Sequence, residues 1–243
     1  MTKKLNKILV VVIPVSNEEG NISDFVNNIL KILSFLNKTY LVLSFDQTNK
    51  DKSLDIAKSL AKKNSNIKIV NKPTSNPVEA YLNGYYEAIQ IKCDYIVEIN
   101  AGYRHQPDDL KKLYNGLNQN IDCIFGSRFI EGANCFSNNF FRYFLSKQGS
   151  AFSNLLLGTK LTDMTSGFIC IKKNILKNIL ENTIILSRFH FFQTELKYYL
   201  RDFSYVEIPI TYNTNGKNLP FNVIFESLYN LFQLFMKRIK GCK

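Results

Sequence analysis

The chain has 243 residues, of which 45% are hydrophobic and 21% are charged, which is the composition of an ordinary globular protein. This length can bury a substantial core, as one α/β domain or as one domain with an appendage. No apolar run approaches the roughly 18 residues that a membrane-spanning helix needs. The N-terminal sequence MTKKLNK leads into a strand-like run without a small-residue cleavage site, so we expect no signal peptide.

The formal net charge of +11 suits three kinds of partner: nucleic acid, an anionic membrane surface or a phosphorylated ligand. Solubility alone would also account for it. The sequence has no zinc-finger, RNA-recognition or helix-turn-helix signature, so we expect no nucleic-acid partner.

The five cysteines are scattered, odd in number and without a CxxC pair. They are Cys93, Cys123, Cys135, Cys170 and Cys242. This pattern predicts reduced thiols in a cytoplasmic protein, and neither a disulfide framework nor a metal site.

The first half of the chain alternates apolar runs with helical periods. The predicted strands comprise residues 8–15, 40–45, 67–70 and 95–99, and the predicted helices comprise residues 22–32, 53–63 and 79–91. The first strand is continuous and β-branched, which is typical of a central parallel strand buried on both faces. The alternation predicts a parallel, doubly wound sheet. No GxGxxG motif follows the first strand, which disfavours a dinucleotide-binding oxidoreductase.

Within the third predicted helix, small residues recur at Ala80, Gly84 and Ala88. Small residues at this spacing favour close packing on a sheet over contact with a ligand.

The second half is less regular. The pattern predicts strands at residues 123–129, 169–171 and 205–210, helices at 139–157 and 191–200, and a polar turn at 162–168. From residue 221 to 239 apolar residues recur with a 3.6-residue period, which predicts an amphipathic helix ending in the basic sequence MKRIKGCK. We therefore expect a domain at 1–219 and a C-terminal helix at 220–243. That helix either packs on its own domain or lies in a membrane interface, and the pattern favours neither.

Residues 94–109, DYIVEINAGYRHQPDD, combine a short strand, a polar loop and the start of a helix. This is the layout in which α/β enzymes place their chemistry at the carboxyl end of a strand. Asn100 and Gly102 are two residues apart, so on an extended strand they would face the same side. Two carboxylates at this spacing would hold a divalent metal, and neither residue is a carboxylate.

Seven segments, in order and at sensible spacing, resemble family 2 glycosyltransferases. They are VVIPVSNEEGNI, FDQTNKDKSLDIAKSLA, VEINAGYRHQPDDL, FGSRFIEG, TDMTSGF, FFQTEL and VEIPITY, and together they cover about residues 8–220. Within that family they are most similar to the dolichyl- or polyprenyl-phosphate mannosyltransferases. The resemblance implies a GT-A fold, which is a Rossmann-like, mostly parallel sheet flanked by helices. Such a fold binds a nucleotide sugar at the ends of its first strands.

The resemblance also implies a set of donor-binding residues. Those expected to bind the nucleotide sugar are Pro14, Ser16, Glu18, Asp46, Asn100, Gly102 and Arg104. Carboxylates at strand ends accept hydrogen bonds from ribose hydroxyls and base N–H groups, which makes the placement of Glu18 and Asp46 physically sensible.

On the acceptor side, Arg128 and Arg142 align with family arginines near the acceptor phosphate, whose oxygens suit guanidinium forks. Asp163 takes an acidic position beside the acceptor. His105 aligns with a loop histidine, and it is either catalytic or a brace for the loop.

The family's D-x-D motif becomes Asn100-Ala101-Gly102, and the second Asp of a DD pair is Gln47. Because hard divalent cations prefer carboxylates, we expect Mn²⁺ or Mg²⁺ to bind weakly at Asn100 and Gly102, or not at all. Arg104 either places a fixed positive charge on the donor diphosphate, in the role of the metal, or is a solvated loop arginine. Alternatively, the chain has lost catalysis and serves as a binding subunit.

The implied reaction is inverting transfer of a hexose from a nucleotide diphosphate sugar to a polyprenyl phosphate. A phosphate acceptor is anionic near neutral pH, so it needs positioning more than a general base. A glycan hydroxyl as acceptor would need a base, which Asp163 or His105 would supply. We expect a peripheral protein on the cytoplasmic face of a membrane.

Overall fold

The computed structural model describes residues 7–36, 38–117, 121–137, 140–214 and 220–241. Its strands are β1 (Leu9–Val15), β2 (Thr39–Phe45), β3 (Ile67–Asn71), β4 (Tyr95–Glu98), β5 (Cys123–Ser127), β6 (Asn134–Ser137), β7 (Ile169–Lys172), β8 (Tyr205–Pro209) and β9 (Thr211–Thr214). Its helices are α1 (Ile22–Ile32), α2 (Ser53–Lys63), α3 (Pro77–Gln90), α4 (Asp109–Gly116), α5 (Phe140–Leu157), α6 (Lys173–Asn182), α7 (Phe192–Tyr199) and α8 (Phe221–Ile239).

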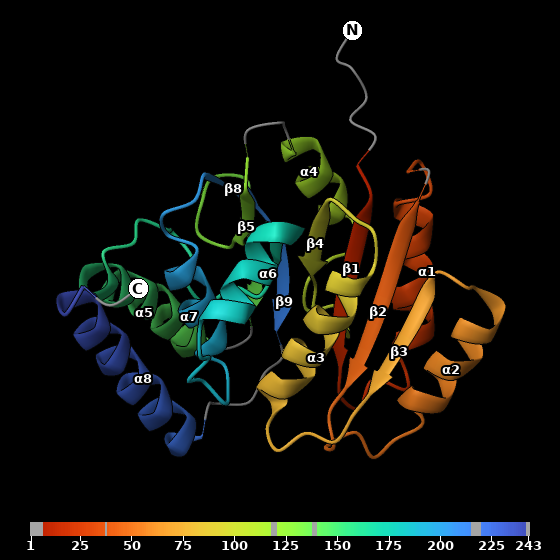
Figure 1. Cartoon of the computed structure of the whole chain (residues 1–243), viewed down its shortest axis with the longest axis horizontal. Helices are drawn as coiled ribbons and strands as arrows, with labels where there is room; N and C mark the ends of the chain where they lie inside the picture. Colours follow the sequence, from red (N-terminus) through yellow and green to blue (C-terminus); the bar gives the residue numbers. More distant parts are fainter. Residues whose placement is uncertain (1–6, 37, 118–120, 138–139, 215–219, 242–243) are drawn as a thin grey trace, which may run out of the picture.

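Within the described residues, the main sheet has the strand order β3-β2-β1-β4-β7-β5-β8 (Figure 1). The central strand β1 pairs in parallel with β2 and β4, as the doubly wound prediction requires. The sheet is mostly parallel, as expected, and β7 is the strand that runs antiparallel to its neighbours β4 and β5. The turn before β7 is bonded to Arg128, just past the carboxyl end of β5. Strand β7 therefore starts at that edge and runs back into the sheet.

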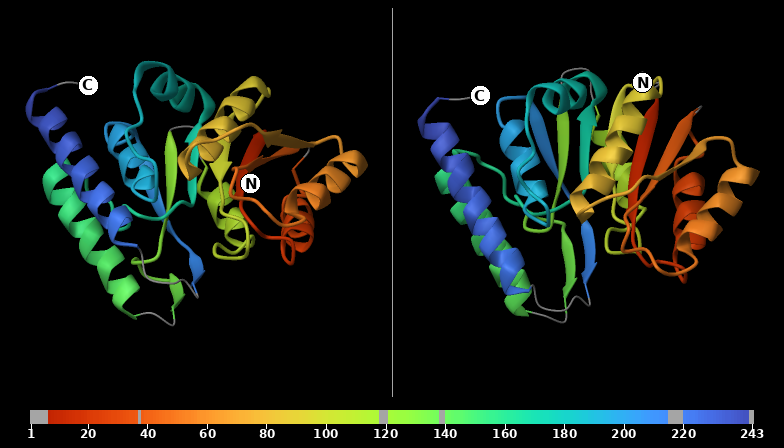
Figure 2. Two further views of the ribbon diagram at one scale, coloured as in Figure 1. Left: turned by 90° about the horizontal axis from the view of Figure 1, so that it is seen from below. Right: turned by 60° about the horizontal axis from the view of Figure 1, so that its bottom comes forward.

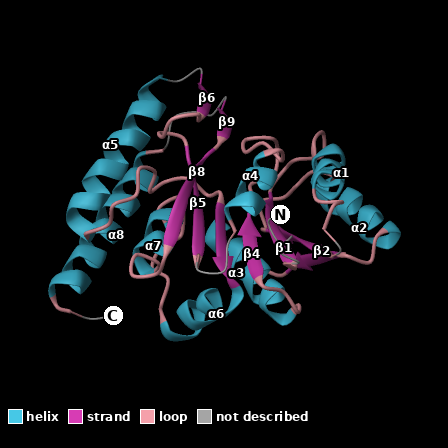
Figure 3. Cartoon of the chain, turned by 90° about the horizontal axis from the view of Figure 1, so that it is seen from above, coloured by secondary structure: helices cyan, strands magenta, loops and turns pink. Residues whose placement is uncertain are grey.

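The core lies on both faces of the sheet, because successive residues of β1 point in opposite directions. Leu9, Val11 and Ile13 join one core with residues of α1, α2 and α4, whereas Val10 and Val12 join the other with residues of α3, α6 and α7. All five side chains are fully buried. Figure 3 shows α3 and α6 on one side of the sheet and α1 and α4 on the other. Burial on both faces explains the continuous apolar run of this strand.

Helix α3 approaches the sheet closely at Gly84. A Cβ added there would lie 2.6 Å from Cγ1 of Val12 and 2.9 Å from Oγ of Ser44, which confirms the close packing expected of its small residues. Ala80, one turn earlier, is also buried, and it lines the pocket described below. Its small size therefore serves both the packing and the pocket.

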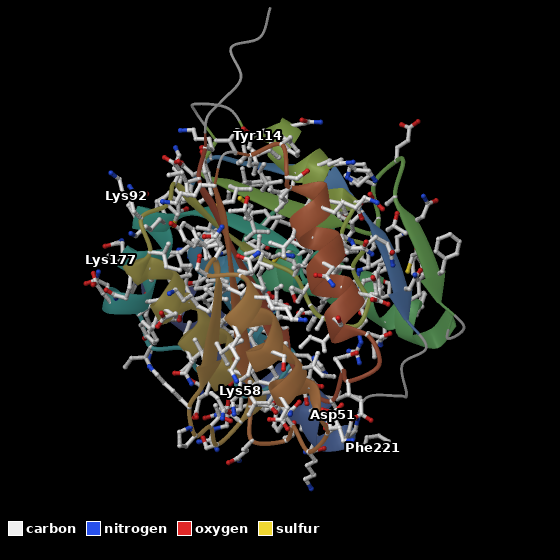
Figure 4. All side chains as sticks on the ribbon, turned by 90° about the vertical axis from the view of Figure 1, so that its right-hand side faces the viewer. Asp51, Lys58, Lys92, Tyr114, Lys177 and Phe221 are labelled. Atoms are coloured by element: carbon white, nitrogen blue, oxygen red, sulfur yellow. The ribbon has the colours of Figure 1, made fainter. Side chains whose placement is uncertain are left out.

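Helices α5 and α8 lie side by side at one edge of the molecule (Figure 2). One face of α8 packs inward, where Val223, Leu231 and Leu234 are buried. The other face exposes large apolar side chains, which are Phe221, Phe225, Leu228, Tyr229, Phe232 and Ile239. Figure 4 shows the first of them at the outside of the molecule. No helix in the described part of the chain is long and apolar enough to span a bilayer.

Three short elements, β6, β9 and α6, were not expected from the sequence. Strands β6 and β9 are four residues each and pair with one another away from the main sheet. Helix α6 did carry a signal, because Ile175, Leu176, Ile179 and Leu180 recur at helical spacing and are all buried. The four cysteines in the described residues are free thiols, as expected, and Cys242 lies outside that part of the chain.

Candidate active site

The loops that follow β1 and β2 are hydrogen-bonded to each other at the carboxyl edge of the sheet. Asn17 has a left-handed backbone (φ 56°), which asparagine tolerates better than most residues. Its Oδ1 accepts a hydrogen bond from the N–H of Lys50 at 2.8 Å, and the N–H of Glu18 donates to Oγ of Ser53 at 2.7 Å. These bonds fix the position from which Glu18 extends.

A pocket of about 410 Å³ opens at this edge and reaches α5 and α8. Its polar end is lined by residues at the ends of β1, β2 and β4, which are Pro14, Ser16, Glu18, Asp46, Asn100, Arg104 and His105. Arg128 lines the pocket as well. Gly102 and Asp163 do not line the pocket, and the side chain of Arg142 falls outside the described part of the chain. The pocket thus brings together eight of the residues that the sequence singles out.

The loop after β4 is not an extended strand. Strand β4 ends at Glu98, and Gly102 (φ 78°) and Tyr103 (φ 58°) both have left-handed backbones that turn the chain sharply. The expectation that Asn100 and Gly102 face the same side of a strand is therefore wrong.

The residues at this edge do not fit a divalent metal. A Cβ added at Gly102 would lie 2.4 Å from both carboxylate oxygens of Glu18, so Glu18 fills the space of a side chain at position 102. Asn100 offers one neutral oxygen, which already accepts a hydrogen bond from the Tyr81 hydroxyl at 3.3 Å. Among the described residues there is no group of three or more His, Cys, Asp or Glu that could hold a metal. Mg²⁺ and Mn²⁺ favour octahedral sites built of oxygen ligands, and this edge does not supply such a set.

His105 is 1% exposed and packs against the rings of Phe168 and Tyr212. Its Nδ1 accepts a hydrogen bond from the N–H of Asn100 at 3.4 Å, which assigns the proton of the neutral ring to Nε2. Nε2 has no partner among the described residues. Burial, together with the nearby Arg128 guanidinium, lowers the pKa of His105 to about 3, so the ring is neutral at pH 7. The residue braces the loop and also keeps one N–H unused.

Asp163 is fully buried and ion-paired with Arg128. Nε and Nη2 of Arg128 donate to the two carboxylate oxygens at 2.7 and 2.8 Å in a forked geometry. The backbone N–H groups of Thr165 and Ser166 also donate to Asp163, each at 3.1 Å. Burial alone would raise the pKa of Asp163, but the Arg128 guanidinium and these hydrogen bonds hold it well below its usual range. Asp163 is thus a fully engaged carboxylate whose geometry suits orienting Arg128.

Two further buried polar groups support this region, and both were missed from the sequence. Lys197 is fully buried and donates to the backbone oxygen of Asp163 at 2.6 Å; its burial lowers its pKa to about 8. Glu98 accepts hydrogen bonds from the hydroxyl of Tyr85 and from Nε2 of Gln193, and its burial raises its pKa to about 8. The helix that starts in the FFQTEL segment carries a signal for Lys197 and for Gln193, the partner of Glu98, because Gln193 and Lys197 are four residues apart on one helix face.

Elsewhere the pocket wall is richer in apolar side chains, which are mixed with Ser146, Ser153, His190 and Ser227. The residues there come from α5, α8 and the segment leading into α7, and they include Leu145, Phe152, Phe189, Phe191, Ile224, Leu228 and Leu231. Leu145, Phe152 and Leu228 are also 37–51% exposed, so the apolar wall continues onto the open surface of α5 and α8. One pocket therefore combines polar strand-end residues, an arginine and a group of apolar side chains.

This fold matches those of solved glycosyltransferases. The chain superposes on glucosyl-3-phosphoglycerate synthase from Mycobacterium tuberculosis in complex with Mn²⁺, UDP and phosphoglyceric acid, with a TM-score of 0.67, 14% identity, and 97% of this chain and 79% of that chain covered. Its complex with Mg²⁺ and UDP gives a TM-score of 0.64 at the same identity, covering 97% and 80%. The architecture is therefore that of a GT-A-type glycosyltransferase.

Residues 10–180 match the model of glycosyl transferase family 2, and the chain belongs to that family. It is 30% identical over 135 residues to polyprenol monophosphomannose synthase of Mycolicibacterium smegmatis, covering 55% of this chain and 51% of the relative. It is 27% identical over 174 residues to undecaprenyl-phosphate mannosyltransferase of Micrococcus luteus (70% and 71%), and 25% identical over 230 residues to dolichol-phosphate mannosyltransferase of Pyrococcus furiosus (92% and 62%). The matched part spans about half of the first relative and less than two thirds of the third.

Proposed function

We propose that the protein transfers a hexose from a nucleotide diphosphate sugar to a polyprenyl phosphate, with inversion at the anomeric carbon. Family membership supports this class of reaction, and so do three relatives named polyprenol monophosphomannose synthase, undecaprenyl-phosphate mannosyltransferase and dolichol-phosphate mannosyltransferase. The observation that carries it is that one pocket combines polar strand-end residues, the largely buried Arg128 and a group of apolar side chains. A lipid phosphate has a matching combination of chemistry, with an anion at one end and a long apolar tail.

The donor nucleotide would bind at the polar end. Glu18 and Asp46 present carboxylates there, and the hydroxyl of Ser16 lies 2.8 Å from that of Thr48. Asp46 accepts hydrogen bonds from the N–H and hydroxyl of Thr48, which orient its carboxylate while it retains acceptor capacity. Ribose hydroxyls and base N–H groups are the natural donors to such carboxylates, and Pro14 supplies an apolar contact beside them.

The acceptor phosphate would bind at Arg128. Nε and Nη2 of this residue face Asp163, and its side chain also lines the pocket, so the pair presents a pre-oriented cation to an incoming anion. A phosphate oxygen then attacks the anomeric carbon from the face opposite the leaving group, and the nucleoside diphosphate departs with the electron pair of the broken C–O bond. Because the attacking oxygen is already anionic, no base is needed.

His105 would serve as a hydrogen-bond donor at the junction of the two substrates. Its ring is neutral, and Nε2–H is unpartnered within the described part of the chain. A ring whose pKa is about 3 is a poor general base at pH 7. Since Asp163 is also engaged, the two residues that a hydroxyl acceptor would require as a base are both unsuited to that role.

The lipid tail would leave along the apolar wall toward the exposed faces of α5 and α8. We propose that these faces lie in the interface of an anionic membrane, with residues 220–243 as the main contact. Phe225 and Phe232 are 71% and 55% exposed, and Lys237 and Arg238 in the last turn supply positive charge for lipid headgroups. The cytoplasmic membrane face is the location that fits this arrangement.

A transfer assay tests the proposed function. The full chain is incubated with radiolabelled GDP-mannose or UDP-glucose and phosphatidylglycerol vesicles containing undecaprenyl phosphate. We expect a lipid-linked sugar from one donor, with an anomeric configuration opposite to that of the donor. Nucleotide binding without lipid-linked product, or product only on an added glycan hydroxyl, would replace this function with a binding subunit or a glycan-building transferase. If neither nucleotide bound, the proposed function and these two alternatives would all be contradicted.

The membrane contact is tested in the same assay with a double substitution. Phe225→Glu with Phe232→Glu should reduce transfer to vesicle-borne undecaprenyl phosphate at least tenfold, and should leave transfer to a short, soluble prenyl phosphate unchanged. Tyr86→Glu is the matched control, because Tyr86 is 45% exposed on α3, away from α5 and α8. Equal transfer by the double variant and the control would contradict the membrane contact.

A further inference from the structure

We infer that Arg104 takes the place of a divalent cation in this protein, binding the diphosphate of the donor so that transfer proceeds without a metal. This inference rests on the proposed function and specifies how the donor is held. It follows from a mismatch between the metal-binding positions expected of the family and the residues that this chain places there.

The backbone conformation at position 102 favours glycine and disfavours any side chain that could bind a metal. Its φ of 78° lies in the region that residues with a Cβ rarely adopt. The Glu18 carboxylate also occupies the space that a Cβ would need, with both oxygens 2.4 Å from that point. An aspartate at position 102 would therefore have a left-handed backbone and would require the end of the Glu18 side chain to move aside. The backbone conformation and the position of Glu18 thus both disfavour a second carboxylate at this point.

The oxygens that remain nearby already have hydrogen-bond partners. Asn100 accepts from Tyr81, Asp46 accepts from Thr48, and Glu18 accepts from the side-chain amide of Asn21 at 3.2 Å. A neutral amide and two carboxylates on separate loops differ from the compact set of oxygen ligands that a hard cation needs. The same carboxylates suit a nucleoside, which asks only for hydrogen-bond acceptors.

Arg104 has an exposed side chain on a backbone that is held in place by hydrogen bonds. Its side chain is exposed, lines the pocket beside Asn100, and forms no hydrogen bond or ion pair with any residue that the structure describes. Its backbone oxygen accepts a hydrogen bond from the N–H of Asn213 at 2.8 Å, and the oxygen of Tyr103 accepts one from Gln106 at 2.8 Å. The loop is therefore tied down on both sides of the residue while the guanidinium is available. An exposed arginine at a pocket wall suits a phosphate-rich ligand.

The charge balance of the step needs a cation here. When the anomeric C–O bond breaks, its electron pair goes to a β-phosphate oxygen, and the departing diphosphate gains negative charge. A guanidinium held beside that oxygen stabilises this charge through forked N–H···O bonds, which are stronger than bonds between neutral groups. A divalent metal held by two carboxylates would supply the same positive charge. In this chain Arg104 carries it as part of the covalent structure.

Nucleotide binding tests this inference separately from transfer. The affinities of UDP and GDP for the full chain are measured by titration calorimetry after metal stripping, once with EDTA and once with MnCl₂. We expect the better of the two nucleotides to bind with the same Kd in both conditions. Arg104→Ala should weaken binding in EDTA by about tenfold or more, which is the scale of losing charge-assisted hydrogen bonds. Arg104→Lys should recover part of the loss.

Lys111→Ala is the charge-matched control. Lys111 is an exposed residue of α4 outside the pocket, and its substitution removes one positive charge, as Arg104→Ala does. Unchanged binding by Arg104→Ala, or a loss no larger than that of Lys111→Ala, would overturn the inference. Nucleotide binding that appears only with MnCl₂ would overturn it too, and would leave the proposed transfer intact. The failure of both nucleotides to bind in either condition would instead contradict the proposed function.

Discussion

The Arg128–Asp163 pair allows a sharp test of whether Asp163 acts by orienting its partner. The Asp163 side chain is 0% exposed and that of Arg128 is 9% exposed, so Asp163→Asn leaves a buried guanidinium without its counter-charge. Removing one partner of such a pair costs about 3–5 kcal/mol. For a chain of this size each kcal/mol lowers Tm by roughly 2–4 °C, which gives a total fall of roughly 6–20 °C.

The measurement is thermal unfolding followed by circular dichroism, alongside urea unfolding at pH 7. Arg128→Met combined with Asp163→Asn removes both charges, so it should recover part of the stability lost in Asp163→Asn alone, and a double-mutant cycle gives the coupling. An Asp163→Asn variant as stable as the wild type but inactive in transfer would refute the reasoning. It would show that the carboxylate acts in the chemistry and does not serve to hold Arg128.

Two further predictions concern the core beneath the pocket. Gly84→Ala should destabilise the protein by about 1–2 kcal/mol in urea unfolding, because the new Cβ would lie 2.6 Å from Val12 and overpacking outweighs the gain in helix propensity. Gly149→Ala in α5, where nothing lies within 4 Å of the new Cβ, is the control and should be neutral or stabilising. Equal changes in stability for the two variants would contradict the packing argument. Glu98 has its pKa raised by burial from 4.5 to about 8, so its contribution to stability is full below about pH 4.5 and is lost as the pH rises through about 8. Glu98→Gln should remove a slope of up to about 1.4 kcal/mol per pH unit across that window, and parallel stability curves for the two proteins would count against the raised pKa.

Much of the fold was determined by local sequence pattern. The continuous apolar run of β1 predicted a central strand covered on both faces, and the 3.6-residue period of residues 221–239 predicted α8 with the ends that the structure gives it. Both patterns depend only on which faces of a single strand or helix are buried, so they can be recognised in the sequence without knowing which residues cover those faces. The seven family-like segments likewise predicted the GT-A architecture, because they follow the order of its strands and loops.

The antiparallel course of β7 and the geometry of the site were decided by tertiary structure. The sequence placed Asn100 and Gly102 on one face of a strand, whereas the folded loop turns at Gly102 and brings Glu18, 84 residues earlier in the chain, into the space of a side chain there. It offered Asp163 as a catalytic group, and the fold surrounds that carboxylate with Arg128 and backbone N–H groups. It did not say whether α8 packs on its own domain, and the fold buries Val223, Leu231 and Leu234 of that helix. Contacts between residues far apart in the chain set each of these outcomes, and the free energy of such contacts depends on distances that no local pattern encodes.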